Sequence, residues 1–299
     1  MKNWKRKDSG KSFEETENEI FKDFVGARTE SSAYIVKEND DAYKLLLRFL
    51  KKPIRIVGDY DVDGQTATAE MILGLRALGA TDIDFYAPKR FTDGYGLSTT
   101  IVDRFLTGEP GLLVTVDNGI AACDAIKKAK QLGWSVLVID HHLPVIERGK
   151  IILPEADVII DPHAKAGTAN FEDYCAAGLV FKLFQHILTA YNAINTFTFD
   201  KIQSLAAIGT VADSVKLIEK IGGNYVYDNW LIVKRGLETL LQNQGRTNGL
   251  YCLLRILNLE YKINETNIGY TLAPVMNSVS RLNDDGAKEV IKLLLREDN

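Results

Sequence analysis

Residues 54–64, Ile-Arg-Ile-Val-Gly-Asp-Tyr-Asp-Val-Asp-Gly, decide the fold of this chain. A run rich in β-branched residues, typical of a buried strand, ends in three aspartates at alternate positions, Asp59, Asp61 and Asp63. Their carboxylates gather at the tip of that strand. Like charges so close together stay ionised only beside compensating cations. Carboxylate oxygens are ligands for divalent metals, so we predict a divalent metal site here.

The same aspartates also match the calcium loop of an EF-hand. Residues 59–70 read DYDVDGQTATAE, with Glu70 at the last ligand position. An EF-hand needs a helix that enters the loop, whereas Pro53 separates the helical-looking segment 40–52 from the loop and a strand pattern follows it. Residues 65–79 fit an amphipathic helix that would contain Glu70. We therefore favour a strand, a loop and a helix over the calcium interpretation.

Short apolar runs alternate with helical patterns from residue 54 to about residue 163, which indicates βαβ units and a parallel sheet. We predict an α/β fold with a mainly parallel five-stranded sheet flanked by helices, its strands at 54–58, 82–87, 111–117, 135–140 and 157–161. Beyond residue 170 the apolar spacing becomes helical. We expect three parts: a polar leader and N-terminal helical segment at 1–50, the α/β core at 51–170, and a predominantly helical C-terminal segment at 171–299.

Polar residues follow three of these predicted strands. Asp59 follows the first, Asp117 ends the third, and Asp140 ends the fourth with His141 and His142 directly after it. In an open parallel sheet the ligand site lies at the carboxyl ends of the strands. Asp117 alone could cap the next helix, since VDNG suits a turn or a cap. The coincidence of three strands favours one shared site instead.

Asp213 follows an almost wholly apolar or small run, SLAAIGTVA, at residues 204–212. An acid in that position is either a surface residue at the end of a helix or a placed ligand. Taken with the acids and imidazoles already expected at the sheet edge, we interpret Asp213 as a ligand.

Composition limits the possible functions. The chain has 299 residues, 46% of them hydrophobic, a formal net charge of −4 and a pI near 5.7. This charge does not indicate nucleic-acid binding over the whole surface, although bound cations would reverse the field locally. The three cysteines form no C-x-x-C pair, and no apolar run reaches the length of a membrane span. We expect a cytoplasmic protein without membrane association.

The expected donor set suits hydrolysis of phosphoesters. Aspartates mixed with imidazole favour manganese, or a similar first-row ion, over magnesium alone, although magnesium stays an option. No serine or cysteine has an evident base partner. The economical mechanism uses two ions about 3.5–4 Å apart, bridged by one aspartate, that activate water and neutralise the leaving oxygen.

Four segments resemble, in order and spacing, the motifs of the DHH phosphoesterase superfamily: GDYDVDG at 58–64, VTVDNGI at 114–120, IDHH at 139–142 and AAIGTVAD at 206–213. The segment PKRFTDGYGLS at 88–98 resembles the RecJ branch, which contains 5′→3′ exonucleases specific for single-stranded DNA. The resemblance runs from about residue 54 to about residue 296. It implies a manganese-dependent phosphodiesterase that acts on single-stranded DNA or a short oligonucleotide.

The resemblance also implies roles for particular residues. The matches to metal ligands, with Asp117 as the bridge, are Asp61, Asp63, Asp117, His141 and Asp213. Asp59 and Asp140 match acidic positions close to the metals; we place Asp59 with the ligands, and Asp140 with His142 and Arg281 as the catalytic residues. His142 matches a residue that contacts the scissile phosphate. Asn277 and Arg281, in MNSVSRLND, resemble a motif that grips phosphate, a role that suits a guanidinium.

Two departures from the family pattern leave alternatives open. Val275, Met276 and Ser280 occupy the part of the phosphate motif where the family carries its first arginine and a glycine. The glycine-rich second domain and the OB fold of RecJ proteins are not found in these residues, so a separate chain could supply them. A small-substrate or short-oligonucleotide phosphatase and a non-catalytic scaffold are the alternatives. The intact acids argue against the scaffold, because clustered carboxylates are costly without metal.

Overall fold

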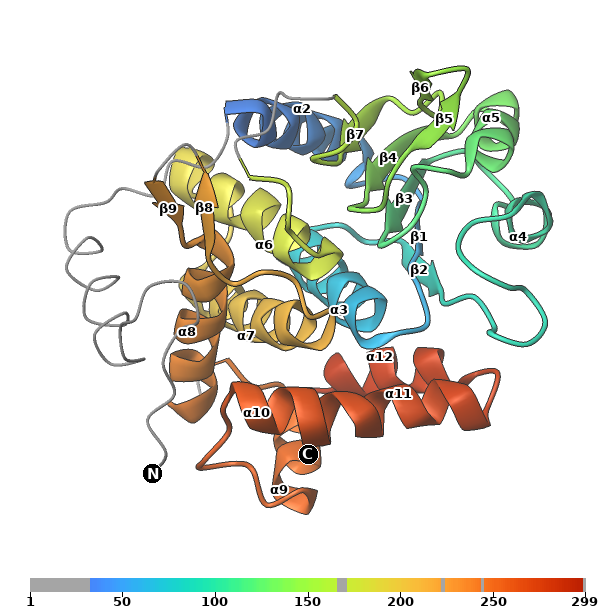
Figure 1. The fold of residues 1–299 in the computed structure, drawn as a ribbon. Coiled ribbons are helices and arrows are strands. Elements are labelled where there is room, and N and C mark those ends of the chain that lie inside the picture. Colours follow the sequence, from blue (N-terminus) through green and yellow to red (C-terminus); the bar gives the residue numbers. More distant parts are fainter. Residues whose placement is uncertain (1–32, 166–170, 222–223, 243–244, 298–299) are drawn as a thin grey trace.

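A computed structural model describes residues 33–165, 171–221, 224–242 and 245–297 (Figure 1). Its centre is a five-stranded, fully parallel sheet with the strand order β2-β1-β3-β4-β7. The strands are β1 Ile54–Val57, β2 Ile83–Tyr86, β3 Leu112–Val116, β4 Ser135–Ile139 and β7 Val158–Ile160. The predicted α/β fold and its five parallel strands are therefore confirmed.

Both faces of the sheet are covered, which explains why its strands read as nearly continuous apolar runs. Alternate residues such as Ile56 and Val114 face the large helical body, while Val57 and Leu113 pack on the other side. That second side is covered by α4 Thr99–Phe105 and α5 Cys123–Gln131. Figure 1 shows these two helices on the opposite side of the sheet from α3 and α6.

The helix α3, Val62–Ala77, is the centre of the helical body. Every residue from 62 to 75 is buried, because the sheet lies on one side and α6 Ala176–His186, α7 Thr196–Ala212 and α12 Gly286–Leu294 surround the rest. Gly74 allows the close approach of α6, since a Cβ there would lie 2.0 Å from the Phe184 ring. The helix was expected from residue 65, but it begins at Val62 because Asp61 caps it.

The rest of the described chain is mostly helical, as predicted beyond residue 170. The other helical elements are α2 Ala33–Phe49, η1 Ile187–Tyr191, α8 Asp228–Leu241, α9 Asn248–Ile256, α10 Glu265–Asn267, η2 Ile268–Leu272 and α11 Ala273–Leu282. Two hairpins were not predicted: β5 Val145–Glu147 with β6 Lys150–Ile152, and β8 Glu219–Ile221 with β9 Asn224–Val226. The expected polar leader lies mainly outside the described residues. No helix in the described ranges is long and apolar enough to cross a bilayer.

Candidate metal centre

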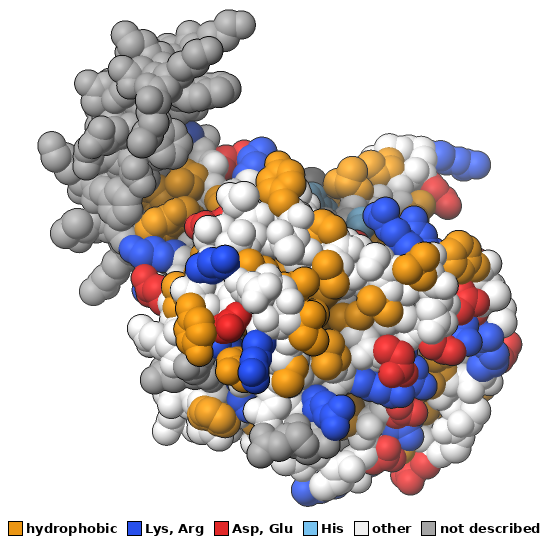
Figure 2. All heavy atoms as spheres, turned by 90° about the horizontal axis from the view of Figure 1, so that it is seen from below, with side chains coloured by type: hydrophobic (Ala, Val, Ile, Leu, Met, Phe, Trp, Pro, Cys, Tyr) orange, Lys and Arg blue, Asp and Glu red, His pale blue; other side chains and the backbone are white. Residues whose placement is uncertain are grey.

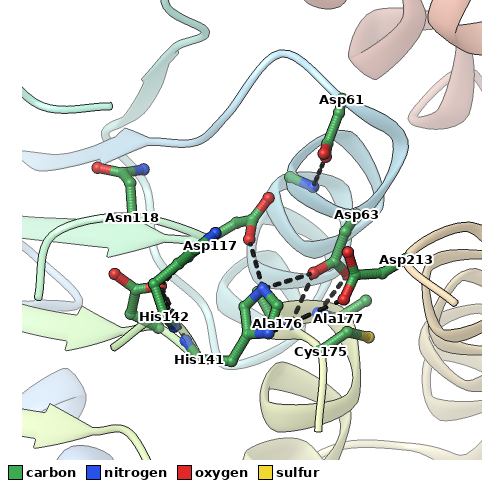
Figure 3. Close-up of polar contacts among 12 residues, drawn as sticks. Asp61, Asp63, Asp117, Asn118, His141, His142, Cys175, Ala176, Ala177 and Asp213 are labelled. Atoms are coloured by element: carbon green, nitrogen blue, oxygen red, sulfur yellow. Dashed lines mark hydrogen bonds and ion pairs between the residues drawn. The ribbon is translucent and has the colours of Figure 1, made fainter. Parts of the chain in front are cut away.

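The acidic residues meet where the order of the sheet reverses. After β1 the chain continues to β2 on one side and later returns to β3 on the other, so a crevice opens between the carboxyl ends of β1 and β3. Asp59 follows β1 and Asp117 follows β3, which places both acids at this crevice. Figure 3 shows Asp117 pointing toward the start of α3, where Asp61 and Asp63 lie.

The start of α3 presents its acids through a tight turn. Asp61 is the N-cap residue, and its Oδ1 accepts a hydrogen bond from the backbone N–H of Gly64 at 3.1 Å. Gly64 packs directly on the preceding loop, since a Cβ there would lie 2.7 Å from the backbone nitrogen of Asp59. Only glycine therefore allows Asp59, Asp61 and Asp63 to gather around one helix end.

Asp63 is held by the start of a second helix. Its Oδ2 and Oδ1 accept hydrogen bonds from the backbone N–H groups of Ala176 and Ala177, at 2.7 and 2.9 Å. These amides belong to the first turn of α6, where the helix dipole favours a negative charge. Gly209 of α7 approaches the same carboxylate, since a Cβ there would lie 2.9 Å from Asp63 Oδ1. This close packing brings Asp213, at the end of α7, to the centre.

His141 lies among carboxylates from three different elements. Its Nε2 is 3.1 Å from Asp117 Oδ1 and 3.7 Å from Asp63 Oδ2, and its Nδ1 is 3.8 Å from Asp213 Oδ2. Figure 3 shows the imidazole between Asp117 and the pair formed by Asp63 and Asp213. We expected Asp213 near His141, and the structure places it there.

Asp117 adopts a backbone conformation that is uncommon for a residue with a side chain, with φ at 63°. The next residue, Asn118, stabilises this turn: its Nδ2 donates to the carbonyl oxygens of Val57, Gly58 and Val116 at 2.9–3.1 Å. Asn118 thus ties β1 to β3 below the acids. Our prediction did not single out Asn118, because the tetrapeptide VDNG signals a turn without showing what its amide binds.

The potential ligand atoms form three overlapping groups, two of which share no residue. Of these two, one contains Asp63, His141 and Asp213, and the other contains Asp59, Asp61 and Asp117; within each group the ligand atoms lie within 4.8 Å of one another. The third group, Asp117 with His141 and His142, joins these two through the short contact between Asp117 and His141. Carboxylate oxygens with one imidazole fit divalent first-row cations. The structure brings together all six residues that we predicted as ligands, and their metal-binding role stays a prediction.

Burial makes these carboxylates difficult to ionise without a cation. Loss of hydration, reinforced by neighbouring acids, raises the pKa of Asp59 and of Asp213 to about 7. The same two causes raise the pKa of Asp117 well above its usual value. One Asp59 oxygen is buried and has no hydrogen-bond partner among the described residues. A divalent cation bound at the cluster would therefore stabilise the ionised carboxylates.

Asp140 differs from its neighbours because it is surrounded by donors. Burial opposes its ionisation, but hydrogen bonds from His142 and from the Ile120 amide, at 2.8 and 2.9 Å, hold its pKa below the usual value. The hydrogen bond to Asp140 raises the pKa of His142 in turn. The structure thus pairs Asp140 and His142, two of the three residues that we predicted as catalytic; the third, Arg281, is on α11.

Tyr95 is a site residue that our prediction did not name. Its hydroxyl donates to the carbonyl oxygen of Asp117 at 3.0 Å and lies 3.1 Å from the His142 ring nitrogens. Next to it, the Tyr60 ring packs edge-on at 6.5 Å between centroids, and Arg90 lies 5.1 Å from the Tyr60 ring centroid. Tyr95 and Arg90 belong to the segment PKRFTDGYGLS, so that resemblance was the available signal.

The predicted phosphate motif is on α11, apart from the acids. Arg281 is exposed in the last turn and Asn277 is partly buried, and neither has a described contact with the cluster. The loop after α11 contacts the loop after β2, where Asp284 Oδ1 accepts from the Phe91 amide at 3.3 Å. Figure 2 shows a few histidine atoms in a notch at the upper edge of the face drawn. The roles of Asn277 and Arg281 stay predictions.

Comparison with known proteins gives consistent matches. Residues 53–210 match the DHH family, N-terminal domain. The single-stranded-DNA-specific exonuclease RecJ of Salmonella typhimurium is 34% identical over 263 residues, and that of Bacillus subtilis is 36% identical over 267 residues. These alignments cover 82% and 88% of this chain, but only 42% and 30% of the relatives. The chain therefore spans less than half the length of either relative.

Solved structures agree with this similarity. A crystal structure of exonuclease RecJ bound to manganese matches with a TM-score of 0.73 and 28% identity, covering 91% of this chain and 63% of that one. RecJ of Thermus thermophilus in complex with Mn²⁺ matches with a TM-score of 0.70 and 26% identity, covering 91% of this chain and 36% of that one.

Proposed function

This chain belongs to the DHH family, and from that premise we propose that it is the catalytic part of a RecJ-like exonuclease. It would hydrolyse phosphodiester bonds of single-stranded DNA from the 5′ end. One observation carries this proposal: two groups of potential ligands share a border at Asp117 and His141, 3.1 Å apart, on the floor of an acidic crevice. Such paired sites are typical of enzymes that cleave phosphoesters.

We propose manganese as the metal. The donor set suits it, and two of the similar RecJ structures are described as containing it. Asp63, His141 and Asp213 would hold one ion. Asp59, Asp61 and Asp117 would hold a second. When bound, such ions supply Lewis acidity toward phosphoryl oxygens and water.

The chain's own residues supply the remaining chemistry. The contact with Asp140 at 2.8 Å orients His142 and favours its protonated form. A protonated His142 can use its other ring nitrogen to donate to an oxygen of the scissile phosphate, which stabilises developing negative charge. The Tyr95 hydroxyl contacts the same ring, 3.1 Å from each ring nitrogen. Asn277 and Arg281 remain the proposed phosphate contacts on the α11 side.

Single-stranded DNA, or a short oligonucleotide, is the proposed partner of the crevice. RecJ relatives are longer than this chain, and a further domain, in the same or another chain, would be needed to track a long strand. The isolated chain should therefore be weakly processive. We place its function in the cytoplasm, which is supported by its three free cysteines.

A length series of 5′-labelled single strands tests the function. With manganese, the chain should release short products from the 5′ end, leave duplex DNA uncut and lose activity when a chelator is added. Substitution of Asp117 should abolish release. Rapid cleavage of mononucleotide-like substrates alone would instead identify a small-substrate phosphatase. No manganese-dependent cleavage of any substrate, together with intact manganese binding, would favour a scaffold.

A further inference from the structure

A second polar pocket lies away from the acidic crevice, between α6 and α8. Both helices pack on α7, and the pocket opens between them with a volume of about 140 Å³. This volume is several times the ~30 Å³ that one water molecule occupies in the liquid. A small polyatomic ion therefore fits. The lining residues are Phe181, Lys182, Gln185, Asp228, Leu231, Ile232 and Arg235.

The floor of the pocket contains a buried charge pair. Lys182 is only 9% exposed, and its Nζ lies 3.4 Å from Asp228 Oδ2. Asp228, 4% exposed, also accepts a hydrogen bond from the Tyr174 hydroxyl. The one carboxylate of the pocket is therefore already shared by two donors. An ammonium group has three N–H donors, and among the described contacts Lys182 uses its ammonium only toward Asp228.

Two further donors line the pocket without a described partner. Arg235 lies two turns after Asp228 on the same face of α8, is exposed, and forms no ion pair among the described residues. Gln185 lies one turn after Lys182 on α6, and its side chain forms no hydrogen bond within the described ranges. The pocket thus holds two cations against one carboxylate, and its donors outnumber its acceptors.

We propose that this pocket binds a phosphate-class oxyanion. Arg235 offers the planar, forked donor that matches a tetrahedral oxyanion, Lys182 supplies a fixed positive charge at the floor, and Gln185 adds a neutral donor. Phe181, Leu231 and Ile232 complete the lining around these donors. None of these residues belongs to the acidic cluster, so the proposal does not depend on the proposed function.

Three probes separate the possible sources of the anion: inorganic phosphate, thymidine 5′-monophosphate and a short single-stranded oligothymidylate. Binding of each probe to the whole chain is measured by titration calorimetry. A chelator is present throughout, so that phosphate cannot bind through a metal ion at the acidic cluster. Ionic strength is held constant with sodium chloride. Binding of inorganic phosphate assigns a site for the free ion. Binding of the nucleotide or the strand alone assigns a site for an esterified phosphate.

Variants locate the binding. Arg235→Met should weaken the affinity by about tenfold or more, as expected for the loss of a charged hydrogen bond. Gln185→Leu should weaken it less. Arg255→Met is the matched control, because Arg255 is exposed on α9 and away from the pocket. If no probe binds with any dependence on Arg235 or Gln185, or if Arg255→Met weakens binding equally, the proposal is wrong.

Discussion

His141 Nε2 lies 3.1 Å from Asp117 Oδ1, although the two residues follow different strands of the sheet. This contact joins the two groups of potential ligands, so a change at Asp117 should affect both. Asp117→Asn keeps the shape of the side chain, and asparagine tolerates the left-handed φ of 63°. Loss of the charge should lower manganese-dependent cleavage by more than about 100-fold. Changing a residue that only supports a metal ligand costs up to about 100-fold, and loss of a ligand itself should cost more.

The same variant should not be less stable than the parent chain without metal, because one of several mutually repelling carboxylates has been removed. Thermal unfolding with and without manganese measures this. The parent should gain stability from manganese and the variant should not. Asp124→Asn, an exposed change on the neighbouring helix α5, is the control. Full manganese-dependent activity in Asp117→Asn would contradict the bridging role.

Stability without metal should fall as pH rises from about 4 to 7. Burial, with repulsion from other acids, raises the pKa of Asp59 and Asp213 to about 7, compared with 3.8 for an unperturbed aspartate. Between these values the folded chain keeps protons that the unfolded chain has released, so the free energy of unfolding decreases with pH. Saturating manganese should flatten this dependence. Denaturant unfolding at several pH values measures it, and a metal-free chain that becomes more stable across this interval would disprove the interpretation.

Glu70 should destabilise the chain. Its side chain is fully buried in α3, neither carboxylate oxygen has a described hydrogen-bond partner, and burial raises its pKa well above the usual value. Glu70→Leu should increase the free energy of unfolding by about 1–3 kcal/mol, the usual cost of an unsatisfied buried polar group. The gain should be larger at high pH. There the unfolded chain ionises Glu70 freely, whereas the folded chain must either keep the proton or bury the charge, and both lower its stability. Glu109→Leu, in an exposed loop, is the control.

Tyr95→Phe should lower turnover without loss of metal binding. The variant removes the hydroxyl that contacts His142 and the Asp117 carbonyl, and one hydrogen bond of about 1 kcal/mol corresponds to a roughly five- to tenfold effect. Steady-state kinetics and manganese titration separate the two properties. Tyr60→Phe is the matched control, since the adjacent Tyr60 has no described hydrogen bond from its hydroxyl. Equal losses in both variants would argue against a specific role for the Tyr95 hydroxyl.

Gly209→Ala should disturb the fit of α7 against the acids. The added methyl group would lie 2.5 Å from both Ala177 Cβ and Thr66 Oγ1, which is too close without a shift of helices. Overpacking of this kind costs about 1–3 kcal/mol, and manganese affinity should fall as well. Gly178→Ala is the control, because its nearest neighbour would be at 3.6 Å. Unchanged stability and affinity in Gly209→Ala would show that α7 can move freely.

The sheet and most of its acids could be predicted because both signals are local. Each central strand is a short apolar run, and Asp59, Asp117 and Asp140 come just after or at the end of one. In the two short hairpins every strand has three residues, and the side chains of β5, β6 and β8 are exposed or half-exposed, so these segments carry little periodic signal. The EF-hand pattern misleads at Glu70, because pattern matching does not show that this residue is buried inside a helix.

Long-range contacts could not be read from the sequence. The Asp63 carboxylate binds backbone amides of residues 113 and 114 positions later, and backbone amides have no sequence signature. The Asn118 amide reaches carbonyl groups 60 and 61 positions earlier. These contacts depend on how helices and strands meet in three dimensions. Residue types at strand ends predicted which side chains gather, and the packing determines how they are held.

The hydrogen bonds from the first turn of α6 to Asp63 connect two halves of the chain at the cluster: the sheet with α3, and the helices from α6 onward. Asp63 and His141 come from the first half, at the start of α3 and just after β4, whereas Asp213 and the two amides come from α7 and α6 of the second half. An ion bound by residues of both sets would hold the two halves together. Cation binding and the packing of the two halves would then be thermodynamically linked. Weaker packing between α3 and α6 would lower the affinity for the cation. Removal of the cation would, in turn, lower the free energy needed to separate the two halves.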